Sequence, residues 1–343
     1  DHNLYVCASD TAELRRHLLL RDYLRLHGED RDAYASLKRQ LAVEAGQDRG
    51  VYVDRKEEAA RPFIEAVLAR ASDEQQKRAN ALHLFSHVPV WRAFVMSAVE
   101  EGRGHLLVDD APSPRAAVLF YGRLVIYAGD PQVPGVVDLV RSFPFQTMIL
   151  DYDPGWHRLL VSMAESAGSS GSPTPGRRWH LQADSFRGGA NPAGTLSGPD
   201  DVGPQSSGQQ PVPRAAQLDD IPTLQDSLGW EHQLYHYVDG YDFLDRAHPY
   251  LIEESGRIAA GASSFVTSQA WAECQVSTSE AYRGRGLGTL VAKAYLQAAQ
   301  SAGLTVSWDA ANESSVRLGT RLGYEEVREY AVIEGLTLPP KSW

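Results

Sequence analysis

A glycine-rich turn in the last third of the chain restricts the possible fold more than any other feature of the sequence. Between a stretch of strand character at 271–278 and a helical stretch at 287–302 stands the segment Tyr282-Arg283-Gly284-Arg285-Gly286-Leu287-Gly288-Thr289. Its glycines let the backbone approach a ligand closely, and the free N–H groups at a helix start form an anion site. The arginines suit phosphate oxygens. A tight strand-to-helix connection with nothing bound would have the same pattern, and the turn lacks the Gly-Lys-Ser/Thr ending of a P-loop.

The residues around this turn predict a mixed α/β domain over 214–343. Two helices come first, and apolar patterning then predicts three strands, at 248–254, 257–266 and 271–278. After the helix at 287–302 we expect a strand at 304–309, a helix at 314–322 and a final strand at 327–333. The predicted order is therefore β-β-β-α-β-α-β.

The rest of the chain divides into three further segments. Residues 185–213 hold six glycines, five prolines and four serines among 29 residues, which predicts a linker because such a stretch buries too little apolar surface to order itself. Residues 78–184 alternate helical and strand patterns and predict an α/β accessory domain. Residues 1–77 predict a strand at 3–7 followed by three helices, near 10–23, 30–44 and 55–71.

Composition excludes several classes of partner. The formal net charge of −11 argues against nucleic-acid binding, which depends on a clustered basic surface. No apolar run approaches the roughly 18 residues of a membrane span, so we expect no membrane partner. With only two cysteines, far apart, a disulfide scaffold is ruled out and a cytoplasmic location is expected.

Two motifs about 24 residues apart resemble the GNAT superfamily of acyl-CoA N-acyltransferases. The first is Arg283-x-x-Gly286-x-Gly288, and the second is Asn312-x-x-Ser315-x-x-Leu318 ending in Leu322-Gly323-Tyr324. The resemblance implies a GNAT fold with an upstream α/β accessory domain and a helical N-terminal segment, and acetyl-CoA (coenzyme A) as cofactor. The implied cofactor contacts are Val276, Ser277, Thr278, Arg283, Gly284, Arg285, Gly286, Leu287, Gly288, Thr289, Asn312 and Ser315.

A narrower resemblance points to one branch of that superfamily. The segments Ala272-Glu273-Cys274-Gln275-Val276 and Trp308-Asp309-Ala310-Ala311-Asn312, together with the turn, are similar to a branch that includes acetyltransferases that inactivate the antibiotic zwittermicin A. Members of that branch carry an extra α/β region upstream. The resemblance therefore covers about residues 78–335.

The resemblance assigns catalytic roles to the strand before the turn. A backbone N–H at Val276 or Ser277 is expected to bond the thioester oxygen as charge develops. Glu273 matches the position of the family's general base, and partial burial would raise its pKa toward the working range. Alternation places Glu273 and Ser277 on one face and Cys274 on the other, where a packed thiol is expected rather than a nucleophile. Alternatively, Glu273 contacts a cationic substrate, or it faces solvent and has no role in the reaction.

One position departs from the family pattern. Many GNAT enzymes carry a tyrosine general acid seven residues after the motif asparagine, and Gly319 stands there in this chain. Tyr324 and Tyr330 are the candidates for that role, and core packing or coenzyme contact is the alternative for each.

Aromatic and acidic residues of the 230–242 stretch are candidates for amine binding. Acids would favour an ammonium group and aromatic faces would add cation–π attraction, although packing of the first helices on the sheet explains the same pattern. The predicted substrate contacts are Trp230, Glu231, Tyr235, Glu273, Trp308 and Asp309. His232 and His236 have the i, i+4 spacing of metal ligands, but no third ligand follows at motif spacing, so no metal is expected.

The first segment resembles a different family. The runs His2-Asn3-Leu4-Tyr5-Val6 and Tyr34-Ala35-Ser36-Leu37-Lys38 look like the C-terminal part of the GrpB family, which has a nucleotidyltransferase-like fold. The Gly-Ser turn and acidic pair of that family do not occur in this segment, so nucleotidyl transfer is not predicted. We expect a partial domain that serves packing or dimerisation, with a homodimer as the corresponding assembly.

Together these observations predict an acetyl-CoA-dependent N-acetyltransferase that acts on the primary amine of a small molecule, such as an antibiotic or an amino-acid-like metabolite. The alternative is a non-catalytic acyl-CoA-binding module with the nucleotidyltransferase-like remnant as an interaction segment. The glycine turn and Glu273 favour the enzyme, whereas Gly319 favours the binding module.

Overall fold

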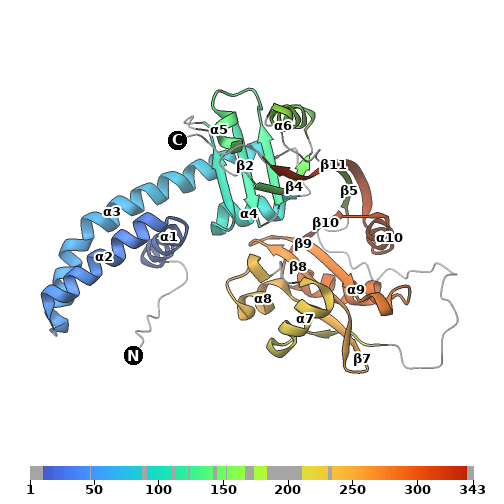
Figure 1. Ribbon diagram of the computed structural model, residues 1–343. Helices are drawn as coiled ribbons and strands as arrows, with labels where there is room; N and C mark the ends of the chain where they lie inside the picture. The colour runs from blue at the N-terminus through green and yellow to red at the C-terminus, as the bar shows by residue number, and fades with distance from the viewer. Residues whose placement is uncertain are drawn as a thin grey trace. The chain divides into compact units, whose positions relative to one another are not determined.

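The protein is described by a computed structural model whose chain divides into two compact units, Asp1–Asn80 and Ala81–Trp343 (Figure 1). The structure describes residues 11–46, 48–86, 91–109, 113–122, 124–141, 145–151, 153–166, 174–183, 211–230 and 234–337. The strand predicted at 3–7 and most of the linker predicted at 185–213 lie outside these ranges. Within them, no helix combines the length and the apolar composition needed to cross a bilayer.

The first unit is built from helices, as predicted. They are α1 (Ala12–Leu26), α2 (Gly28–Ala45) and α3 (Arg49–Ala81), the last much longer than the predicted 55–71. The Thr11 hydroxyl accepts a hydrogen bond from the Leu14 N–H at 3.2 Å and caps α1. Gly46 ends α2 at a φ of 63°.

The second unit is a mixed α/β structure that contains both predicted α/β regions. Its helices are α4 (Arg92–Glu101), α5 (Val136–Arg141), α6 (Pro154–Ser166), α7 (Ile221–Leu228), α8 (Gly240–Ala247), α9 (Leu287–Ser301) and α10 (Glu313–Arg321). Its strands are β1 (His105–Val108), β2 (Ala116–Tyr121), β3 (Leu124–Gly129), β4 (Phe145–Asp151), β5 (Thr174–Gln182), β6 (Arg214–Ala215), β7 (Tyr250–Glu254), β8 (Arg257–Thr267), β9 (Trp271–Thr278), β10 (Thr305–Ala310) and β11 (Glu325–Thr337).

One sheet holds all of the strands described. Its order is β1-β2-β3-β4-β11-β5-β10-β9-β8-β7-β6. The predicted β-β-β-α-β-α-β order is confirmed as β7-β8-β9-α9-β10-α10-β11. The two predicted α/β regions are joined through this sheet, because β5 pairs antiparallel with both β10 and β11 and β11 pairs further with β4.

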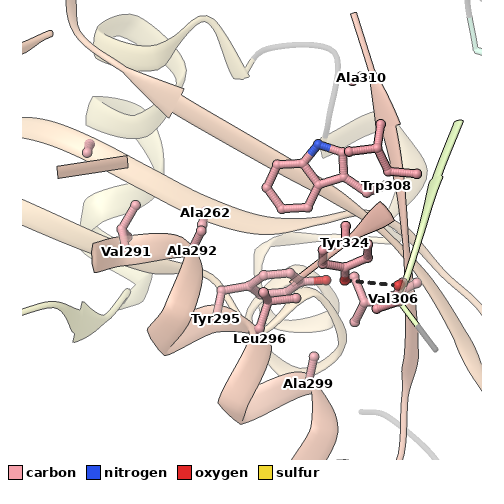
Figure 2. Close-up of a cluster of buried hydrophobic side chains, with 14 of the residues drawn as sticks. Ala262, Val291, Ala292, Tyr295, Leu296, Ala299, Val306, Trp308, Ala310 and Tyr324 are labelled. Atoms are coloured by element: carbon pink, nitrogen blue, oxygen red, sulfur yellow. Dashed lines mark hydrogen bonds between the residues drawn. The ribbon is translucent and has the colours of Figure 1, made fainter. Parts of the chain in front are cut away.

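Opposite faces of the sheet are covered by different helices. Alternate residues of β10, including Val306 and Trp308, pack with the apolar side of α9 (Figure 2). On the other face lies α4, which begins after Trp91 and carries Phe94; both residues belong to a cluster with Tyr330 of β11. The side chains of Ser307 and Asp309 point to this second face by alternation along β10.

Candidate active site

The two parallel strands at the centre of the site diverge. β9 and β10 pair in register from Trp271–Thr305 to Glu273–Ser307. Beyond that point β9 stays paired with β8, whereas β10 pairs with β5. The end of β9, at 274–278, is therefore separated from the end of β10, and a gap opens between two neighbouring strands of one sheet.

A cleft of about 740 Å³ lies at this divergence. Ten of the twelve predicted cofactor contacts line it. These ten are Val276, Ser277, Thr278, Arg283, Gly284, Gly286, Leu287, Gly288, Asn312 and Ser315. Other lining residues, which the sequence reasoning did not single out for the cofactor, include Ser227, Ser279, Glu280, Tyr282, Ser314 and Leu318.

The glycines of the turn have the conformations that the predicted anion site needs. Gly284 and Gly286 have φ of 78° and 76°, a region that favours glycine, and Gly286 is the N-cap of α9 without a side-chain cap. A Cβ at Gly288 would lie 3.3 Å from Thr278 Oγ1 and 3.8 Å from Val276 Cγ1. The start of α9 thus approaches the end of β9 closely, with its first N–H groups beside the cleft.

The two arginines of the turn have different surroundings. Arg283 lines the cleft, and its Nε donates to the Thr278 carbonyl at 3.3 Å. Arg285 instead forms a bidentate ion pair with Glu254, with both N–O distances at 2.8 Å, and does not line the cleft. Thr289 does not line the cleft either.

The second motif closes the other side of the cleft. Asn312 caps α10, since its Oδ1 accepts from the Ser315 N–H at 3.0 Å and from the Ser314 hydroxyl at 2.6 Å. Trp308, buried but lining the cleft, donates its indole N–H to Ser315 Oγ at 3.1 Å.

The two tyrosines considered as the general acid donate hydrogen bonds to other groups, and position 319 has no room for a tyrosine. A Cβ at Gly319 would lie 2.7 Å from Leu181 Cδ2, so β5 fills the space that a tyrosine there would need. Tyr324 is buried and donates to the Val306 carbonyl at 3.1 Å (Figure 2), and Tyr330 donates to Asp309 Oδ1 at 2.7 Å. Neither tyrosine lines the cleft.

Glu273 belongs to the last pair of the parallel ladder, on the face away from α9, and like the two tyrosines it does not line the cleft. It is 4% exposed and accepts a hydrogen bond from the Asp309 N–H at 2.7 Å, and its Oε2 is hydrogen-bonded with the Ser307 hydroxyl at 2.5 Å. Burial, and secondarily the charge of Asp309, raise its pKa to about 8. The Cys274 side chain packs on the α9 face, as alternation predicts, and burial raises the pKa of its thiol.

The other predicted substrate contacts are dispersed. Trp230, predicted as a substrate contact, is part of the core beneath α7 and α8. Its indole N–H donates to Ser277 Oγ at 3.0 Å and so positions β9. Tyr235 is 78% exposed. Glu231 lies outside the described residues. Asp309 is buried and forms an ion pair with Arg178, Nε to Oδ2, at 2.8 Å.

Arg178 was missed at the sequence level because nothing in the local pattern relates β5 to β10, and Ser307 because its contact with Glu273 depends on the pairing of β10 with β9. His236 is buried against Phe265, with ring centroids 4.5 Å apart, and its predicted metal partner His232 lies outside the described ranges. Among the described residues, no three metal-ligating side chains are grouped.

Two diverging parallel strands with a glycine turn at the following helix define a GNAT-type acyltransferase fold. Residues 218–333 match the family model described as GNAT acetyltransferase, and residues 1–70 match that of the GrpB protein. A GCN5-related N-acetyltransferase-like protein from Streptococcus suis shares the fold, with a TM-score of 0.59 and 23% identity over 76% of this chain and 98% of that one.

Two curated relatives match different parts of the chain. The uncharacterized N-acetyltransferase YdfB of Bacillus subtilis is 28% identical over 92 residues, which are 26% of this chain. The UPF0157 protein BH1888 of Halalkalibacterium halodurans is 36% identical over 72 residues, which are 21% of this chain. The chain spans 35% of the length of each relative.

Proposed function

We propose that the second unit is an acetyl-CoA-dependent N-acetyltransferase. The single observation that carries the proposal is the cleft between the diverging ends of β9 and β10, with the glycine turn and the start of α9 along its wall. The match of residues 218–333 to the GNAT acetyltransferase family, whose members use acetyl-CoA, supports the same activity.

The residues of the cleft fit such a cofactor. The uncapped N–H groups after Gly286 and the Arg283 guanidinium would hold its pyrophosphate, because both favour phosphate oxygens. A backbone N–H at Val276 or Ser277 would donate to the thioester carbonyl oxygen. When bound, acetyl-CoA supplies an acetyl group activated as a thioester.

Glu273 would act as the general base. It would take a proton from the substrate ammonium, so that the neutral amine nitrogen can form the new C–N bond as the C–S bond breaks. As the amide forms, its nitrogen loses a second proton, and the leaving thiolate would take up this proton through water, since the tyrosines considered for this step donate hydrogen bonds elsewhere.

For the acceptor we propose the primary amine of a small molecule, an antibiotic or an amino-acid-like metabolite. The support is the similarity of the 272–312 region to the branch that includes zwittermicin A acetyltransferases. We further propose a cytoplasmic enzyme, and a homodimer formed through the GrpB-like segment. Light scattering on the full chain and on a 1–77 deletion would test the dimer.

Turnover of acetyl-CoA with a panel of amines tests the activity. We expect amine-dependent release of free thiol and an acetylated product identified by mass spectrometry. Glu273→Gln should lower turnover at neutral pH far more than it lowers coenzyme affinity. Coenzyme binding without thiol release for any amine would favour the second candidate, a non-catalytic acyl-CoA-binding module, for which the glycine at position 319 is the supporting observation.

A further inference from the structure

Glu273 and Asp309 form a buried carboxyl pair on neighbouring strands. Glu273 belongs to the last parallel pair of β9 and β10, and Asp309 lies two residues beyond that pair on the same face of β10. The Asp309 backbone N–H donates to Glu273 Oε1 at 2.7 Å. The Glu273 residue is 4% exposed and the Asp309 side chain 7%. Two charges this close in a dry site repel each other strongly, so the pair retains a proton over part of the pH range.

Hydrogen-bond counting indicates which member carries that proton. The Ser307 hydroxyl has one hydrogen, but it lies 3.1 Å from the Ala272 carbonyl oxygen and 2.5 Å from Glu273 Oε2. Both contacts are satisfied together when Glu273 is protonated and donates to Ser307 Oγ, while Ser307 donates to Ala272. An ionised Glu273 would leave one of the two acceptors without its hydrogen.

Burial raises the pKa of Asp309, whereas its hydrogen-bond partners favour its ionised form. Arg178 donates from Nε to Oδ2 at 2.8 Å, and the Tyr330 hydroxyl donates to Oδ1 at 2.7 Å. Both Asp309 oxygens therefore accept hydrogen bonds, one of them from a permanent cation. The Tyr330 ring is held edge-on against Trp91, with ring centroids 5.4 Å apart.

Other titratable groups near the pair supply no competing charge. His180 lies opposite Asp309 in the β5–β10 ladder, and burial lowers its pKa to about 4, so the imidazole is neutral near pH 7. Burial raises the pKa of the Cys274 thiol and of the Tyr324 hydroxyl, so both are neutral as well. At the start of α4, Trp91 carries no titratable group.

We propose that Arg178 and Tyr330 are positioning residues of the acetyltransferase, which hold Asp309 ionised and thereby place the single exchangeable proton of the pair on Glu273. The inference rests on the proposed function for its catalytic meaning. Arg178 belongs to β5, which lies outside the 218–333 family match. The active site would consequently require a strand from the upstream region, and the family-matched segment alone would lack the group that neutralises Asp309.

The pH profile of kcat/KM for amine-dependent thiol release by the full chain tests this role. In the native enzyme we expect an ascending limb near pH 8, where Glu273 ionises. Tyr330→Phe keeps the ring and removes one donor to Asp309. The proton then moves toward Asp309, Glu273 is ionised at lower pH, and the limb should shift down by about one pH unit. Asp309→Asn should shift it in the same direction.

Two further variants separate positioning from structure. Arg178→Lys should restore most of the native profile that Arg178→Met loses. Arg177→Met is the matched control, because Arg177 is the neighbouring residue of β5, 72% exposed and paired with Glu329; its profile should equal the native one. Unchanged limbs in both Tyr330→Phe and Asp309→Asn, with folding verified by circular dichroism, would overturn the proposal.

A measurement that does not depend on turnover distinguishes a failure of the proton assignment from a failure of the proposed acetyltransferase function. In infrared difference spectra, the native chain at pH 7 should show a protonated-carboxyl band that Glu273→Gln removes. The band should titrate near pH 8, and at lower pH in Tyr330→Phe. If no amine is acetylated but the band behaves in this way, the function fails and the proton assignment stands. A band lost in Asp309→Asn but retained in Glu273→Gln would refute the assignment.

Discussion

Replacing Glu273 by glutamine should make the second unit more stable at alkaline pH. Glutamine reproduces the hydrogen bonds of the protonated acid, since its oxygen accepts from the Asp309 N–H and its NH₂ donates to Ser307 Oγ. The native carboxyl has its pKa raised from an ordinary 4.5 to about 8. Its contribution to stability is therefore intact below pH 4.5 and is lost as the pH rises toward 8.

The size of the effect follows from that interval. At about 1.4 kcal/mol per pH unit, the span from 4.5 to about 8 corresponds to up to about 5 kcal/mol. We expect Glu273→Gln and the native chain to have similar free energies of unfolding at pH 5, and the variant to be more stable by several kcal/mol at pH 9.

Urea unfolding followed by tryptophan fluorescence measures this difference, because all seven tryptophans lie at position 91 or later. Glu326→Gln, at an exposed position of β11, is the matched control and should show no pH-dependent difference. A constant difference between Glu273→Gln and the native chain from pH 5 to 9 would refute the reasoning that burial holds Glu273 protonated.

Three further predictions concern the cleft and its walls. Gly286→Glu should weaken coenzyme A binding by roughly a hundredfold or more in calorimetry, because a carboxylate would face the phosphate site. Gly303→Glu, with φ of 81° and open surroundings like Gly286, carries the same backbone strain away from the cleft and should retain affinity. Gly319→Ala should cost about 1–3 kcal/mol in urea unfolding, because its Cβ would meet Leu181 at 2.7 Å; an unchanged midpoint would contradict the packing. Trp230→Phe removes the hydrogen bond to Ser277 and should lower turnover while the melting temperature changes little. Unchanged turnover, or a loss of turnover that is accompanied by a large fall in melting temperature, would count against a role of Trp230 in positioning β9.

The local elements of the second unit could be predicted from the sequence. Period-2 alternation and glycine turns gave the order from β7 to β11, and the motif at Gly286 placed most residues of the cleft. Alternation also placed Glu273 and Cys274 on opposite faces. These properties depend on residues close together in the chain.

The long-range pairings could not be predicted. Nothing near Arg178 indicates that β5 lies between β10 and β11, since strand neighbours are chosen by burial over the whole sheet. The partner of Arg285 was likewise hidden, because Glu254 is brought beside it only by folding of β7. The aromatic stretch that begins at Trp230 was ambiguous, and for Trp230 the core reading applies.

The position of β11 has a consequence for synthesis of the chain. Its first part pairs with β5 and its later part also with β4, so strands from residues 145–182 await a partner at residues 325–337. Contacts between residues so far apart in the sequence slow folding, because the entropic cost of closing the intervening chain must be overcome before the contacts add any stability. Until the ribosome has released residue 337, β4 and one side of β5 expose unpaired backbone groups, and the nascent second unit is open to edge-to-edge association.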